Sequence, residues 1–131
     1  MTTQEHQQIG TQLYLQGQFA AALEEFSKAI LDGENSDIWN DWAMAQLGCG
    51  NTSDGEKGFR RALQHDPKNA TAAMNLVVLL SNLGRSPEAA PFLETAAGDL
   101  PQHERQGIVS LIETIKAFQQ PRAFSATKQP S

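Results

Sequence analysis

Residues 39–67 read WNDWAMAQLGCGNTSDGEKGFRRALQHDP, and this stretch decides the fold of the 131-residue chain. Apolar and small residues recur in it at steps of three and four, which is the period of a helix face. Gly50 interrupts the pattern near its middle, and Pro67 ends it. Glycine permits the left-handed backbone that ends a helix, and proline breaks a helix. The stretch therefore predicts two helices joined by a tight turn.

The same order of residues occurs on both sides of this stretch, at intervals of 33 and then 34 residues. The first copy contains Gly10, Gly17, Phe19, Ala22, Phe26 and Ala29. The second contains Ala43, Gly50, Thr52, Gly55, Phe59, Ala62 and Pro67, and the third contains Val77, Gly84, Ser86, Ala89, Leu93, Ala96 and Pro101. A helix-turn-helix unit repeated at a fixed period is typical of a stacked array.

The pattern predicts helices near residues 4–16, 20–31, 37–49, 53–65, 70–83 and 87–99. Ser53 followed by Glu56 predicts a capping box at the start of one second helix. Ser86 before Pro87 predicts a side-chain cap at the start of the next one.

These spacings resemble the tetratricopeptide repeat, a helix-turn-helix unit of 34 residues. Unit two agrees best, with Trp39, Trp42, Ala43, Phe59, Ala62 and Pro67 at the family's signature positions. Unit three has Leu76, Val77, Leu80, Ala89, Leu93, Ala96 and Pro101, and unit one has Ile9, Gly10, Leu13, Ala22, Phe26 and Ala29. Unit one has Glu34 in the place of the proline. The resemblance implies an all-α fold, a right-handed superhelical array of three such units with a C-terminal covering helix.

We expect one tetratricopeptide domain over residues 3–119, with units at about 3–35, 36–69 and 70–103. The covering helix is expected over 104–119, because a repeat array needs a terminal element on its last unit. Its apolar stripe consists of Ile108, Leu111, Ile112, Ile115 and Phe118. Residues 120–131 contain two prolines and one large apolar residue, Phe124, and are expected to form a flexible tail.

Composition excludes several classes of protein. Ten basic and 15 acidic residues give a net charge of −5, which argues against nucleic-acid binding because phosphate contacts need clustered Lys and Arg. No apolar run approaches the roughly 20 residues that cross a bilayer, and the N-terminus lacks a signal-peptide pattern. The single cysteine excludes an intrachain disulfide. We therefore expect a cytoplasmic protein that is not bound to membranes.

Candidates for catalysis are few and scattered. His6, His65 and His103 lie far apart, and none has a cysteine or second histidine within one helical turn. We therefore expect no enzymatic activity, no metal and no cofactor. Cys49 is expected to be a small buried side chain, and the tryptophan pair of unit two is expected to pack against the core.

In the tetratricopeptide family the first helices line a concave groove that binds peptides or partner helices. By register, the resemblance assigns to this groove Gln7, Thr11, Tyr14, Asn40, Asp41, Met44, Leu47, Met74, Asn75, Val78 and Asn82. Amide side chains hydrogen-bond an extended peptide backbone, and methionine and valine bury its apolar side chains. The alternative is that these residues only solvate the concave face. The resemblance thus implies a non-catalytic protein-interaction module or adaptor.

Family members that bind the acidic tail of heat-shock chaperones carry Lys and Arg in this groove. The corresponding positions here are Gln7, Thr11, Asp41, Thr71 and Asn75, and none is cationic. Residues 1–50 also carry one base against seven acids, which disfavours an acidic partner. The expected partner is a protein or peptide that is neutral to basic and partly apolar.

Two alternatives remain at this stage. In the first, the chain is a self-assembling scaffold, a homo-oligomer in which the groove of one copy receives the covering helix or the Phe124 tail of another. In the second, it is an accessory subunit that positions a separate enzyme. Residues 39–45, followed by Asn75 and Leu76, resemble repeats found beside bacterial glycosyltransferase or methyltransferase domains.

Overall fold

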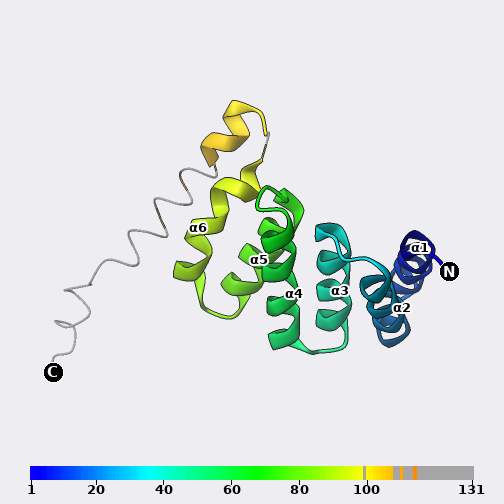
Figure 1. The fold of residues 1–131 in the computed structure, drawn as a ribbon. Coiled ribbons are helices and arrows are strands. Elements are labelled where there is room, and N and C mark those ends of the chain that lie inside the picture. The colour runs from blue at the N-terminus through cyan, green and yellow to red at the C-terminus, as the bar shows by residue number, and fades with distance from the viewer. Residues whose placement is uncertain (99, 108–109, 111–113, 115–131) are drawn as a thin grey trace, which may run out of the picture.

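The computed structural model describes residues 1–98, 100–107, 110 and 114, and the described residues form helices and turns without a strand. The helices are α1 (Thr3–Leu15), α2 (Phe19–Asp32), α3 (Ser36–Gly48), α4 (Thr52–His65), α5 (Ala70–Asn82) and α6 (Ser86–Ala97). Each predicted helix agrees with these bounds to within two residues. Figure 1 shows them following one another as neighbours from the N-terminus onward.

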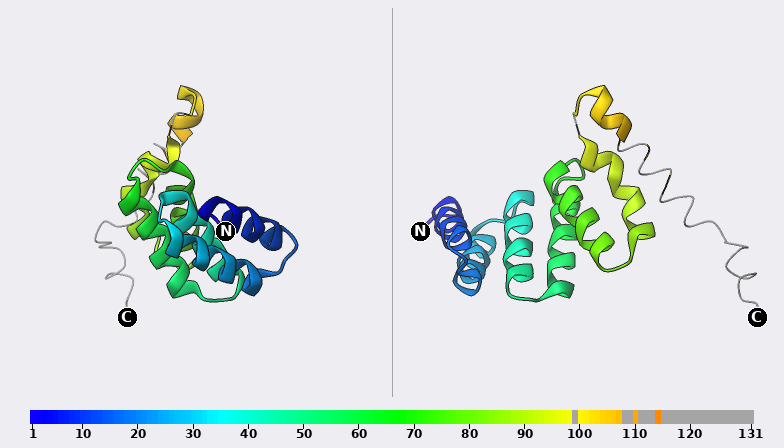
Figure 2. Two further views of the ribbon diagram at one scale, coloured as in Figure 1. Left: turned by 45° about the vertical axis from the view of Figure 1, so that its right-hand side comes forward. Right: turned by 180° about the vertical axis from the view of Figure 1, so that it is seen from behind.

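Consecutive helices pair into hairpins, α1 with α2, α3 with α4, and α5 with α6. The hairpins stack on one another through α2 against α3 and α4 against α5. From behind, they form an extended array with α1 at one end (Figure 2). Helix α1 also contacts α3, and α3 contacts α5, so these first helices line one side of the array. No helix in the described residues has the length and apolar character needed to span a membrane.

Glycine makes the turn inside each hairpin. Gly17, Gly50 and Gly84 have φ angles of 79°, 83° and 74°. A side chain with a Cβ atom is strained in this left-handed region, so the repeated glycine is required by the backbone. The predicted turns are confirmed.

The helix caps differ from the prediction. Side chains cap the first helices of the hairpins, where Thr2, Asn35 and Asn69 accept hydrogen bonds from backbone N–H groups of α1, α3 and α5. The caps predicted at Ser53 and Ser86 are wrong, because the residue after each turn glycine already holds the cap position. Both serines therefore lie one or two residues inside a helix, beyond the position from which a side chain caps the first turn.

The core follows the array, and equivalent positions of successive units are buried alike. Phe26, Phe59 and Leu93 occupy the same repeat position and are at most 2% exposed. One cluster contains Ala43, Phe59, Leu76, Val77, Leu79, Leu80, Ala89 and Leu93. The other contains Ala22, Phe26 and Ala45, with Leu13, Tyr14, Leu23 and Trp42 packed against it. The repeat register read from the sequence therefore corresponds to real structural equivalence.

Trp39 and Trp42 form an edge-to-face pair with ring centroids 5.2 Å apart. Both are partly buried. Trp42 Nε1 donates a hydrogen bond to Ser27 Oγ at 3.2 Å, which joins α3 to α2. Trp39 Nε1 donates to Glu34 Oε1 at 2.9 Å, and Arg61 lies over its ring. The pair therefore packs at a junction between hairpins, as predicted, although neither ring is fully enclosed.

Two glycines allow α4 to approach α3 closely. A Cβ atom on Gly58 would lie 2.7 Å from Ala43 Cβ and 2.8 Å from Trp42 Cε3. A Cβ atom on Gly55 would lie 2.5 Å from Leu47 Cδ2. All three distances are shorter than any normal contact between carbon atoms, so close packing requires these glycines inside a helix that they otherwise weaken.

The chain after α6 is described in part. Residues 102–107 are helical, and their side chains are exposed. The apolar stripe predicted for the covering helix (Ile108, Leu111, Ile112, Ile115 and Phe118) and the tail over 120–131 lie outside the described residues. The covering helix and the flexible tail therefore stay predictions.

Candidate functional site

A small cavity opens where α1 and α3 lie side by side; we call it the α1–α3 cavity. Its walls are Thr11 and Tyr14 of α1, Phe26 of α2, and Asp41 and Met44 of α3, and its volume is about 80 Å³. The sequence register assigned all of these to the groove except Phe26.

Phe26 reaches the cavity because α1 has no side chain at Gly10. A Cβ atom on Gly10 would lie 2.6 Å from Phe26 Cε1, so the aromatic ring packs directly against the α1 backbone. The sequence contained a signal, since Gly10 and Phe26 stand at the small and the aromatic position of the repeat pattern in unit one. Sequence reasoning assigned Phe26 to the core alone and missed its second role in lining the cavity.

Asp41 is the charged side chain of the cavity. Gln7 Nε2 donates a hydrogen bond to Asp41 Oδ2 at 3.0 Å, which ties α1 to α3. Burial raises the pKa of Asp41 above its usual value, the Gln7 hydrogen bond partly offsets this rise, and the negative charge of Asp37 adds to it. Ionised Asp41 is therefore less well solvated than an aspartate on an open surface.

A second polar pair ties α3 to α5. Asn75 Nδ2 donates a hydrogen bond to Asn40 Oδ1 at 2.9 Å. Asn40 is only 8% exposed, and Asn75 is partly buried. A buried amide needs hydrogen-bond partners, so each side chain helps to satisfy the other. The two predicted groove amides therefore also link neighbouring first helices.

The apolar groove residues divide between the core and the surface. Met44 and Leu47 are partly buried against the core cluster of α3 to α6. On α5, Met74 is partly buried, while Val78 is 48% exposed and Asn82 is exposed. These α5 residues lie outside the α1–α3 cavity. The structure thus places four of the predicted residues around one cavity, and it places Val78 outside that cavity, exposed on α5.

The exposed side of α1 adds three amides that the sequence register did not assign, Gln4, Gln8 and Gln12. Together with the assigned Gln7 and Thr11 they line an open depression of about 500 Å³. The spacing of three and four residues places these side chains together on one helix face, and this spacing was the available signal.

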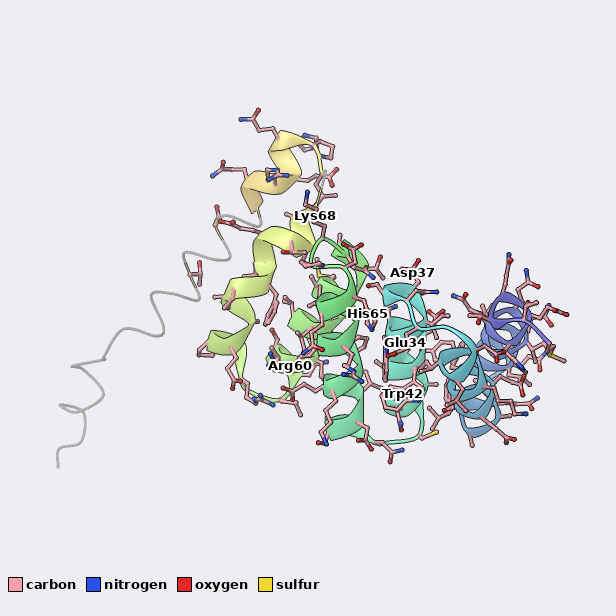
Figure 3. The ribbon with its side chains drawn as sticks, in the orientation of Figure 1. Glu34, Asp37, Trp42, Arg60, His65 and Lys68 are labelled. Carbon is pink, nitrogen blue, oxygen red and sulfur yellow. The ribbon has the colours of Figure 1, made fainter. Side chains whose placement is uncertain are left out.

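The remaining candidates make structural contacts. His6 Nδ1 lies 3.0 Å from Glu25 Oε1, and His65 Nε2 lies 3.5 Å from Glu34 Oε1, a pair that Figure 3 labels. In the part of the chain that is described, no group of histidine, cysteine and acidic side chains is arranged to hold a metal ion. Cys49 is exposed, so its predicted burial is wrong. It follows the last residue of α3 and lies beyond the length of helix that packs.

Residues 56–111 match the model of the tetratricopeptide repeat family. This range runs from within α4 through α5 and α6. The fold is that of a tetratricopeptide-repeat protein. No curated protein has a matching sequence.

Two solved structures are similar to this tetratricopeptide array over most of its length. The second tetratricopeptide domain of human RPAP3, solved in complex with the HSP70 peptide SGPTIEEVD, has a TM-score of 0.68 and 24% sequence identity. The match covers 85% of this chain and 92% of that one. The tetratricopeptide domain of Sgt2 from Aspergillus fumigatus has a TM-score of 0.65 and 17% identity, with 92% of this chain and 85% of that one covered. These likenesses show the common fold.

Proposed function

We propose that this tetratricopeptide-repeat protein is a non-catalytic interaction module, and that the face formed by α1, α3 and α5 binds an extended peptide of a partner protein. The observation that carries the proposal is the α1–α3 cavity, which combines apolar walls with a few polar groups on that face. Apolar walls with a few polar groups are the usual composition of a ligand site, and the volume of about 80 Å³ suits one side chain of a bound peptide. Val78, which the register assigns to the same face, adds an exposed apolar side chain on α5.

The chemistry of the face supports a partner unlike that of the RPAP3 domain. That domain was solved with a peptide that ends in Glu-Glu-Val-Asp. Here the positions assigned by register to the chaperone-binding cations carry no Lys or Arg, and one of them is Asp41. A carboxylate-rich peptide would be repelled by Asp41. We propose a partner segment that is neutral to basic and partly apolar.

The test replaces the apolar contacts with charge. The double variant Met44→Glu, Val78→Glu should retain at least tenfold less partner protein than the wild type in affinity capture from a lysate of the source cell. Burying two new carboxylates against an apolar peptide accounts for the expected loss. Mass spectrometry compares the proteins that the two baits retain.

Two further variants separate a lost contact from a lost fold. Val78→Glu alone changes a residue that is 48% exposed, so it should weaken capture without disturbing the core. Leu31→Glu with Leu83→Glu adds the same charge at residues that are 86% and 43% exposed and lie outside the groove set. Far-UV circular dichroism checks the helical content of every variant. Equal capture by a folded Met44→Glu, Val78→Glu protein, or equal loss in the leucine variant, would reject the groove.

A further inference from the structure

Asp41 carries a charge that its structural contact does not require. Gln7 and Asn40 lie 33 residues apart, and Asp41 and Asn75 lie 34 apart, so the two hydrogen-bonded pairs occupy equivalent positions of successive units. The Gln7–Asp41 distance is 3.0 Å and the Asn75–Asn40 distance is 2.9 Å. At the second junction two neutral amides hold neighbouring first helices together. An amide at position 41 would serve the first junction equally well.

The charge is also placed where it is unfavourable for the free protein. Burial and the nearby negative charge of Asp37 raise the pKa of Asp41, and no Lys or Arg in the described residues pairs with it. Gln7 occupies Oδ2, which leaves Oδ1 as the acceptor for a ligand. A carboxylate that is partly withdrawn from water is stabilised when a cation arrives beside it.

The dimensions of the α1–α3 cavity restrict what can enter. Its volume is about 80 Å³. This is roughly half of an engineered 150 Å³ cavity that accepts benzene, so the cavity has room for the end of one side chain. Tyr14, Phe26 and Met44 supply apolar walls, which suit the methylene groups of a long side chain.

We propose that the α1–α3 cavity is a lysine subsite, in which a lysine side chain of the bound peptide places its ammonium group against Asp41 Oδ1. This inference rests on the proposed function, because a peptide lying along α1, α3 and α5 presents the side chain. Lysine fits better than arginine, since a guanidinium fork gains most from two free carboxylate oxygens and here one is occupied. The acidic N-terminal half also attracts a cationic peptide.

The probe is a displayed library of short random linear peptides, selected on the full-length wild-type chain. Enriched sequences should share one lysine next to apolar residues. The best peptide is then synthesised with that lysine and with norleucine, which has a similar chain length and no charge. Calorimetry measures both peptides against the wild type, Asp41→Asn and Asp37→Asn.

The wild type should bind the lysine peptide about tenfold more tightly than the norleucine peptide, as expected for a partly desolvated charge pair. Asp41→Asn should bind both peptides equally, because asparagine retains an acceptor for Gln7 and removes only the charge. Asp37→Asn is the matched control, since it removes one charge from the same helix at a residue that does not line the cavity. It should keep the tenfold preference.

Several results would overturn the lysine subsite. These are enriched peptides without a shared lysine, arginine in its place, or a preference that Asp37→Asn abolishes as fully as Asp41→Asn does. In each case the groove itself stands if Met44→Glu with Val78→Glu weakens binding of the same peptides. Failure to enrich any peptide above an unrelated bait would reject both the groove and its lysine subsite.

Discussion

Asp41 and Asn75 occupy one repeat position, which links first helices in both units and, under the proposed lysine subsite, also binds the partner in one of them. Both side chains bond to the preceding first helix, and only Asp41 is charged. A residue that is retained for binding commonly costs stability, because the site is incomplete until the ligand arrives. This view gives a prediction about the free protein that does not depend on any partner.

Asp41→Asn should raise the free energy of unfolding at pH 7, by less than about 1 kcal/mol because partial exposure screens the charge. The folded pKa of Asp41 is raised above its unfolded value, so ionised Asp41 opposes folding at pH values above both. As the pH falls through the folded pKa, the wild-type carboxyl becomes protonated and the advantage of the variant should disappear. Urea unfolding at a series of pH values measures the difference. A variant less stable than the wild type at pH 7 would contradict the argument.

At the scale of an element, α4 contains two residues that disfavour a helix. Gly55 and Gly58 lie inside it, and α3 packs where their side chains would be. The cost in helix propensity is about 1 kcal/mol for each glycine relative to alanine, so tight packing offsets a local weakness.

Gly58→Ala should therefore lower the free energy of unfolding by about 1–2 kcal/mol, because overpacking typically costs 1–3 kcal/mol and the gain in helix propensity recovers part of it. Gly107→Ala is the control, since a Cβ atom there would meet nothing within 4 Å. It should leave stability unchanged or slightly raise it. Urea denaturation of both variants decides the matter, and a Gly58→Ala protein as stable as the wild type would show that α3 and α4 can separate without cost.

Periodicity and turn glycines predicted the helices because both act within one element. A cap depends on the exact residue at which the helix begins. The helices begin one or two residues earlier than the prediction requires, so Ser53 and Ser86 lie inside them and do not cap them. Register placed Asp41 in the groove, because equivalent positions of stacked units share a face. It did not reveal that Asn40 and Asn75 bond to each other, since this contact depends on how two hairpins stack.

At the scale of the whole molecule, one arginine joins the second and third hairpins. Arg85, in the turn between α5 and α6, pairs through Nη1 and Nη2 with both oxygens of Glu56 on α4, at 2.7 and 3.0 Å. Its Nε also donates to Glu88 at 2.7 Å, and Arg60 pairs with Glu56 at 3.1 Å. A repeat array gains its stability from such interfaces between neighbouring units.

Arg85→Met should lower the melting temperature at pH 7, because it removes the ion pairs that join two hairpins. The change should be small, since exposed ion pairs stabilise weakly. The hydrogen bond from Arg85 lowers the folded pKa of Glu56, so the pair contributes stability above the unfolded pKa of that carboxyl. This contribution is lost as the pH falls through the folded pKa, and the two proteins should then melt together.

Lys57→Met is the control for Arg85→Met, because it removes one positive charge from exposed α4 surface. It should change the melting temperature less at pH 7. A larger change for Lys57→Met, or an Arg85→Met effect that persists at acidic pH, would count against the Glu56 pairing. Calorimetric scans at several pH values provide both comparisons.

The exposed thiol of Cys49 has a practical consequence for every binding measurement. It is the single cysteine of the chain and lies at the turn between α3 and α4. Oxidation can therefore join two molecules and no more, since each contributes one sulfur atom to the bond. Such a covalent pair presents two grooves, so avidity on a peptide-coated surface would exaggerate affinity, and its mass would imitate self-association. Work under reducing conditions, or with Cys49→Ser, keeps one groove per particle.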